Sequence, residues 1–204
     1  MKNHFTFFGV ANPERVKATK ALVRSFDTAT NDAVEAVVRA LWKAPQRECQ
    51  YCALDLLARR VKHQSDGSLV LLRELVVAKS WWDSVDGIAP VVGAGVLRFP
   101  AWGEQMRLWA VDDNVWIRRV AIIHQLGAGE RVDLQRLADI VLLNTVDPEF
   151  FIRKAIGWAL RQVASTNPDY VVTFVRTHND QLSALSKREA LKNIDKIRAR
   201  VSGG

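Results

Sequence analysis

The sequence lacks the features of a membrane, secreted or disordered protein. No apolar run approaches the roughly 18 residues needed to cross a bilayer. The start, MKNHFTFFGVANPERVK, has no long apolar core followed by a small-residue cleavage site. Hydrophobic residues make up 49% of the 204 and charged residues 25%, which excludes disorder. We therefore expect one domain over residues 1–204, in a cytoplasmic protein without a membrane partner.

The cysteines and histidines lack the spacing of a metal site. The two cysteines, Cys49 and Cys52, form a CxxC pair, but zinc needs two further ligands and redox chemistry of the thioredoxin type needs a preceding strand. The four histidines are scattered without ligand spacing. We expect the cysteines to be helix-packing residues, and no metal or organic cofactor.

Alternating strand patterns are also missing, and helical spacing takes their place. Apolar residues recur every three or four positions in segments such as VEAVVRALWKA and SLVLLRELVVAKSWW. Proline, glycine or asparagine separates these segments, for example at Pro100, Gly127 and Pro148. The sequence predicts an all-α chain of about ten or eleven short helices.

A repeat of 35 residues organises these helices. Rows of this length align five segments, which begin at Gln46, Trp81, Trp116, Phe151 and Ser186. The third position of the rows is charged, and it holds Glu48, Asp83, Arg118, Arg153 and Arg188. The fifth is apolar in four rows, with Gln50 as the exception. Two helices per period indicate a HEAT-like helical-repeat solenoid, an α-α superhelix with a concave groove.

Basic residues gather at the start of one helix in three successive rows. The net charge is +7, which favours a polyanionic partner. The cations are Arg118, Arg119, Arg153, Lys154, Lys187 and Arg188. A cation at a helix N-terminus opposes the helix dipole, so the clustering needs another reason. Phosphate binding in a basic groove is one, and solvated helix starts are the alternative.

Two residues break the packing pattern of the rows. Asp86 takes the sixth position, where three of the other four rows have an apolar filler, and Trp158 takes an eighth position filled elsewhere by smaller residues. Trp82 lies four residues before Asp86, so the two share a helix face, whereas Asp83 lies on another face and is expected to cap the helix or bind an arginine. For Asp86 the alternative is a buried ion pair or a cap, and for Trp82 and Trp158 it is core packing.

A carboxylate between indole rings suits one reaction on nucleic acid. Alkylation at N3 or N7 makes a purine cationic and a good leaving group, and its loss develops an oxocarbenium-like sugar. A fixed carboxylate stabilises that charge and holds the attacking water, while indole faces stabilise cationic groups. The residues alone do not select this use over others.

The chain resembles the AlkD family of bacterial DNA glycosylases. The similarity is carried by WWDSVD, NVWIRRVAIIHQL, EFFIRKAIGWALRQ, NPDYVVTFV and LSKREALKNI, and it runs from FFGVANPERV to about Ile194. The resemblance implies a HEAT-like repeat protein that removes 3-methyladenine and 7-methylguanine from DNA without a base-flipping pocket. It implies that Asp86 is the catalytic carboxylate, that Trp82 and Trp158 line the cleft at the damaged nucleotide, and that Arg119 contacts a phosphate.

The expected partner is therefore double-stranded DNA that contains alkylated purines, bound by a monomer without an obligate protein partner. The DNA-binding candidates are Arg118, Arg119, Arg153, Lys154 and Arg161. Two other functions remain open, a DNA-binding paralogue that excises no base and a protein scaffold whose basic face meets an acidic partner. Salt-sensitive DNA binding would separate the scaffold from the other two, and base release would separate the enzyme from the paralogue.

Overall fold

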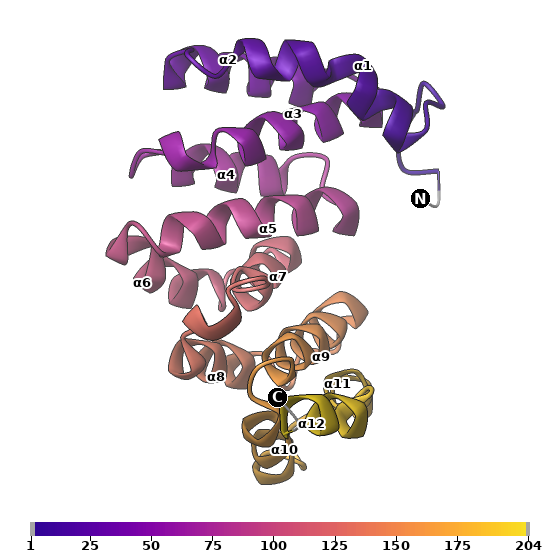
Figure 1. Ribbon diagram of the computed structural model, residues 1–204, viewed down its shortest axis with the longest axis vertical. Coiled ribbons are helices and arrows are strands. Elements are labelled where there is room, and N and C mark those ends of the chain that lie inside the picture. Colours follow the sequence, from indigo (N-terminus) through magenta and orange to yellow (C-terminus); the bar gives the residue numbers. More distant parts are fainter. Residues whose placement is uncertain (1–2, 203–204) are drawn as a thin grey trace. The chain divides into compact units, whose positions relative to one another are not determined.

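The chain is built from α-helices joined by short loops (Figure 1). The structure is a computed structural model that describes residues 3–202, with side chains through residue 199. Its helices are α1 (Asn12–Ser25), α2 (Asn31–Lys43), α3 (Arg47–Arg59), α4 (Ser68–Val77), α5 (Trp82–Val96), α6 (Pro100–Trp109), α7 (Val115–Ile123), α8 (Leu134–Leu143), α9 (Phe150–Ala164), α10 (Pro168–Thr177), α11 (Ala184–Ala190) and α12 (Ile194–Ser202). Two 3₁₀ turns, Val61–His63 and Gly129–Arg131, complete the described elements.

The predicted all-α helical-repeat class is confirmed. In the described part of the chain, the β-type pairing is a single bridge between Thr6 and Gln46. The helix count exceeds the expected ten or eleven because α12 is separate. Asn193, whose φ is 63°, breaks the helical conformation of the backbone between α11 and α12. A left-handed backbone conformation at asparagine commonly ends a helix.

The 35-residue register is visible in the odd-numbered helices. Helices α3, α5, α7, α9 and α11 each begin no more than two residues from the start of a row. The fifth position of every row is 0% exposed, at Gln50, Val85, Val120, Ala155 and Ala190. Gln50 is compatible with this burial because its amide donates hydrogen bonds to the carbonyls of Leu41, Trp42 and Ala44. Those carbonyls lie at the end of α2, where a helix leaves acceptors without partners.

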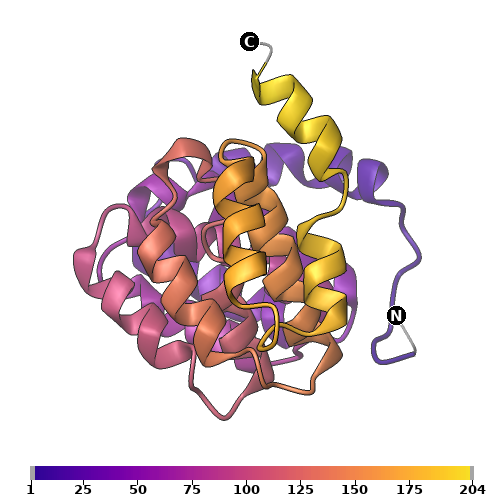
Figure 2. The ribbon, with the colours of Figure 1, turned by 90° about the horizontal axis from the view of Figure 1, so that it is seen from below.

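The helices form two compact units, Met1–Gly95 and Val96–Gly204. In the first, α3 packs against both α1 and α2. In the second, α7, α9 and α11 pack in succession, while α6 and α8 contact each other alongside (Figure 2). Each unit thus contains helix pairs, as a helical repeat requires. The single domain and the concave groove stay predictions.

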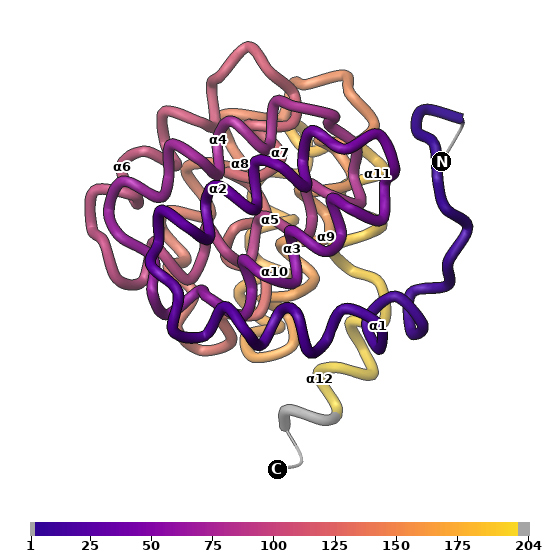
Figure 3. Tube along the Cα trace, turned by 90° about the horizontal axis from the view of Figure 1, so that it is seen from above, coloured from indigo at the N-terminus to yellow at the C-terminus, as the bar shows by residue number. Residues whose placement is uncertain are grey.

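An extended segment precedes α1 and is held at the start of α3 (Figure 3). The Glu48 carboxylate accepts hydrogen bonds from the backbone N–H groups of Phe8, Gly9 and Val10, at 3.0, 2.9 and 3.3 Å. Gly9 has a φ of 83°, a conformation that glycine adopts without strain. Although burial raises the pKa of Glu48, the backbone donors lower it by more, so the net pKa lies below its usual value. The charged form of Glu48 therefore anchors the segment.

Both cysteines lie on α3 as free, partly buried thiols, which confirms that they are unpaired helix residues. The Cys52 sulfur accepts a hydrogen bond from the Arg15 guanidinium of α1 at 3.6 Å. No helix in the described part of the chain is both long and apolar enough to span a membrane.

Gly157 allows the close approach of α9 and α11. A Cβ atom added at Gly157 would lie 2.4 Å from the Glu189 Cβ and 2.8 Å from the backbone oxygen of Ser186. A backbone atom cannot move aside as the end of a side chain can. Gly87 occupies the same seventh register position on α5, but there an added Cβ would meet the end of the flexible Leu54 side chain, at 2.7 Å.

We expect Gly157→Ala to destabilise the protein by about 1–3 kcal/mol, the usual cost of overpacking. Gly87→Ala is the matched control, because alanine favours a helix over glycine by about 1 kcal/mol and Leu54 can rotate. Chemical denaturation of the two variants and of the wild type provides the comparison. Equal stability of the two alanine variants would contradict the close packing at Gly157.

A buried imidazole lies at the end of α7. His124 is 2% exposed, and its Nδ1 lies 2.7 Å from the Ala121 carbonyl oxygen, so Nδ1 carries the proton. Burial lowers the pKa of His124 from 6.5 to about 4. The folded state therefore resists protonation at a pH where the unfolded chain accepts the proton.

Stability should fall as the pH drops from about 6.5 towards 4, by up to about 3 kcal/mol from His124 alone. The unfolded state binds the extra proton in this window, so acid favours unfolding. We expect His124→Gln to reduce this pH dependence, measured as unfolding free energy at pH 7.5 and pH 5. His63→Gln, which changes an exposed imidazole, should retain the wild-type dependence.

Candidate functional site

Trp82 and Asp86 lie in the first two turns of α5, in the first unit. Their four-residue spacing places them on one helix face. The Trp82 side chain is 45% exposed, which is unusual for an indole, and Asp86 is half-buried. Packing in the core is therefore not the role of Trp82, and its indole shares a face of α5 with the Asp86 carboxylate.

Asp83 belongs to a separate, structural network. Arg47, which is 0% exposed, donates from Nε and Nη2 to the two Asp83 oxygens, at 3.0 and 2.7 Å. The Tyr51 hydroxyl donates to the same carboxylate at 2.6 Å. The expectation that Asp83 binds an arginine is confirmed.

The titration of this network reflects its hydrogen bonds. Burial and the neighbouring Asp83 carboxylate raise the pKa of Tyr51 to about 12. Burial also raises the pKa of Asp83, but hydrogen bonds from Arg47 and Tyr51 lower it by more, so the net pKa lies below its usual value. At neutral pH the network holds one anion, one cation and a neutral phenol.

In the second unit, the two arginines of the WIRR motif have protein partners at the start of α7. Arg118 binds Asp147 at 2.8 Å and donates to the carbonyls of Asp112 and Asp113. Arg119 is 4% exposed, and its Nη1 donates to the Phe151 carbonyl at 2.6 Å. The Arg119 guanidinium is therefore buried and oriented by the protein.

Lys154, Trp158 and Arg161 follow one another along one face of α9, at spacings of four and three residues. Trp158 is half-buried. Lys154 and Arg161 both bind Glu189 of α11, at 2.7 and 2.6 Å. Hydrogen bonds from Lys154 and then from Arg161 lower the pKa of Glu189 to about 2. The Lys154 side chain stays 40% exposed, so its remaining N–H donors can reach a ligand.

Arg153 differs from the other candidate cations. The part of the chain that the structure describes supplies no acceptor for its buried Nε. Its backbone carbonyl accepts a hydrogen bond from Ser186 at 2.9 Å, which ties the start of α9 to α11. Arg153 is half-buried, as is Arg118, whereas Arg119 is 4% exposed.

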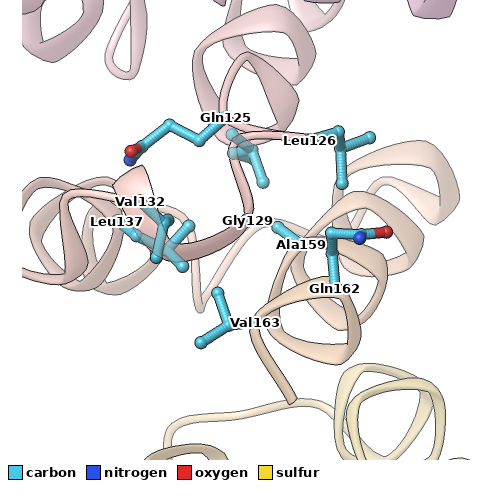
Figure 4. Close-up of a pocket in the computed structure, with 9 residues that line it drawn as sticks. Gln125, Leu126, Gly129, Val132, Leu137, Ala159, Gln162 and Val163 are labelled. Carbon is cyan, nitrogen blue, oxygen red and sulfur yellow. The ribbon is translucent and has the colours of Figure 1, made fainter. Parts of the chain in front are cut away.

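A hollow in the second unit is too small for a base. It lies between α7, α8 and α9 and has a volume of about 10 Å³, with mostly apolar walls that include Leu137 and Val163 (Figure 4). Such a volume holds a single water at most. An open groove of about 500 Å³ borders the Arg118–Asp147 pair, with Val111 and Val146 on its walls. Within the described residues, no three His, Cys, Asp or Glu side chains are grouped to hold a metal ion.

Sequence reasoning missed Arg47, Tyr51 and Glu189. Arg47 and Tyr51 lie in the first row, 36 and 32 residues before Asp83. This separation is close to one repeat period, so a search for charged pairs one period apart could have found Arg47. Glu189, which follows Arg188 in the fifth row, is likewise 35 residues from its partner Lys154.

Comparisons with known proteins agree with the helical-repeat fold. Residues 1–194 match a family model described as DNA alkylation repair enzyme. The chain is also similar to the solved structure of a predicted DNA alkylation repair enzyme from Enterococcus faecalis. The two are 33% identical with a TM-score of 0.87, and the match covers 94% of this chain and 89% of the other. None of the curated proteins matches the chain.

The Glu189 cluster gives a stability prediction for the site. Glu189→Gln removes the shared anion and leaves Lys154 and Arg161 facing each other, so we expect a loss of about 1 kcal/mol at pH 7, because both cations are partly solvated. The folded pKa of Glu189 is lowered, so its stabilisation is present above about pH 4.5 and is lost as the pH falls towards 2. Urea denaturation at pH 7 and pH 3 should therefore show a smaller difference between variant and wild type at pH 3.

Proposed function

Because the chain belongs to the DNA alkylation repair enzyme family, we propose that it is a DNA glycosylase for cationic purines. Its substrates would be N3- and N7-alkylated purines such as 3-methyladenine and 7-methylguanine in double-stranded DNA. The observation that supports the proposal is the face of α5 on which the Asp86 carboxylate and the exposed Trp82 lie together. Alkylated purines, the damage that the family name refers to, carry a positive charge that complements the Asp86 carboxylate on this face.

The reaction would break the bond between the sugar C1′ and the alkylated base. The bond electrons leave with the base, which departs neutral because it began as a cation. The sugar then carries oxocarbenium-like charge, which the Asp86 carboxylate stabilises. Water adds to C1′ and gives its proton to Asp86, from which the proton passes to solvent. The products are the free base and an abasic site, and the balance needs no metal or organic cofactor.

The indoles and cations would hold the DNA rather than react. Trp82 and Trp158 would pack against the sugar and backbone of the lesion, with ring faces that favour cationic groups. Arg119, Arg118, Arg153, Lys154 and Arg161 would contact phosphates. Among these cations, the 40% exposure of the Lys154 side chain favours a direct contact, whereas the carboxylate-bound side chains of Arg118 and Arg161 are only 18% and 27% exposed.

The test is release of 7-methylguanine and 3-methyladenine from methylated DNA, measured by chromatography. We expect wild type to release both above the spontaneous rate. Asp86→Asn should lower the release rate by about 100-fold or more, the usual effect of losing an electrostatic group, while DNA affinity is retained. Asp32→Asn, an equivalent change on the exposed start of α2, is the matched control and should remain active.

Two results would count against the proposal. Release by wild type at the spontaneous rate, together with salt-sensitive DNA binding, would leave a non-catalytic DNA-binding protein. Full activity of Asp86→Asn would preserve the enzyme but remove Asp86 from the reaction.

A further inference from the structure

Arg47 spans the turn that carries the candidate site residues. Its Nη1 donates to the Lys79 carbonyl at 2.8 Å, before the tryptophan pair. Its Nε and Nη2 bind Asp83, and Nη2 also donates to the Ser84 hydroxyl at 2.7 Å, after the pair. One guanidinium thus binds residues on both sides of Trp82.

These contacts fix the orientation of α5 about its own axis. An α-helix has 3.6 residues per turn, so each side chain points in a fixed direction relative to its neighbours. Holding two adjacent side chains, Asp83 and Ser84, therefore sets the direction of every other side chain in that turn. Ser84 also donates to the Trp81 carbonyl at 3.1 Å, and Lys79 has a φ of 52°, so the entry to the helix is a defined turn. Trp82 and Asp86 take their directions from this turn.

Arg47 is itself held from several sides. The Phe5 ring of the N-terminal segment lies over its guanidinium at 4.0 Å, in a cation–π contact. The Arg47 backbone N–H donates to the Thr6 carbonyl at 2.9 Å, and Tyr51 shares the Asp83 carboxylate. The His4 ring of the same segment lies against the Trp81 ring, with the centroids 4.4 Å apart and the planes tilted by 46°. The guanidinium is 0% exposed, so water does not compete for its donors.

We propose that Arg47 is a positioning residue for base excision, acting through Asp83 and Ser84 on Trp82 and Asp86. The inference rests on the proposed glycosylase function. Arg47 does not touch the substrate in this role. Its contribution is to keep the Asp86 carboxylate where the sugar charge develops, and misplacement of a reacting group by about 1 Å can lower a rate by about 100-fold.

Two substitutions test the positioning role of Arg47, and they differ in the number of contacts that they remove. Arg47→Met removes every guanidinium contact, whereas Tyr51→Phe removes one hydrogen bond to Asp83 and keeps the ring. We expect the single-turnover rate of 7-methylguanine release to fall about 10- to 100-fold in Arg47→Met and less in Tyr51→Phe. The Kd for undamaged duplex should stay close to the wild-type value in both. Arg47→Lys keeps the charge without the planar fork, so it should restore part of the rate.

Arg60→Met is the matched control. Arg60 is also buried, at 7% exposed, but its guanidinium donates to the carbonyls of Asp27 and Ala29 and so joins the end of α3 to the loop between α1 and α2. We expect this variant to lose stability and to keep the wild-type release rate, at a temperature where thermal melts show every variant folded. A general loss of structure would lower the rates of both arginine variants together.

Each outcome has a distinct meaning. If wild type releases no base above the spontaneous rate, the glycosylase proposal and this inference both fail. If wild type is active and folded Tyr51→Phe and Arg47→Lys match it, the positioning role is overturned while the glycosylase stands. An equal rate loss in Arg60→Met, or a loss confined to DNA affinity, would also overturn it. If Arg47→Met does not fold, the other two variants decide.

Discussion

Each odd-numbered helix from α3 to α11 must bury the side chain at its fifth register position completely, and the groups around that position are arranged accordingly. The constraint fixes which face of each helix turns inwards. In the second unit, cations at the third and fourth positions of α7 and α9 lie beside the next odd-numbered helix or the loop that leads to it. Arg118 reaches Asp147, Arg119 reaches the Phe151 carbonyl, and Lys154 reaches Glu189. Polar contacts between successive repeats therefore follow from the burial of one apolar position.

This arrangement gives the basic helix starts a second explanation. A cation in the first turn of a helix opposes the dipole, which made phosphate binding an attractive reason for the clustering. The structure supplies a carboxylate or carbonyl partner for Arg118, Arg119 and Lys154, so these three cations stabilise the array whether or not DNA is bound. DNA phosphates would therefore bind to cations that already have protein partners. Lys154 suits such sharing, because an ammonium has three donors and Glu189 accepts from this exposed side chain at one oxygen.

The register and the helical class could be predicted because both depend on spacing within the sequence. A period of 35 and a buried fifth position are properties of the letters alone, and the exception at Gln50 needed only local acceptors from α2. The partners of charged residues could not be predicted in the same way. Asp83 was expected to bind an arginine, but which one depends on how α3 packs against α5. The need for glycine at position 157 likewise arises from a neighbour, Glu189, that is distant in sequence. The exposure of Trp82 was also undecided, since an indole suits a core and a ligand surface equally well.

The two carboxylates of WWDSVD show how neighbours assign roles to identical groups. Asp83 is surrounded by the donors of Arg47 and Tyr51, which keep it ionised and use its oxygens to hold α5. A carboxylate so enclosed cannot approach a substrate. Asp86, one turn later, lies on the face that Trp82 shares, and the orientation of that face is set by the bonds of Asp83. A catalytic charge is most effective when the protein has oriented it before the reaction begins. The buried pair of Arg47 and Asp83 supplies that orientation, so the inert aspartate of the motif is the physical basis for the proposed activity of the other.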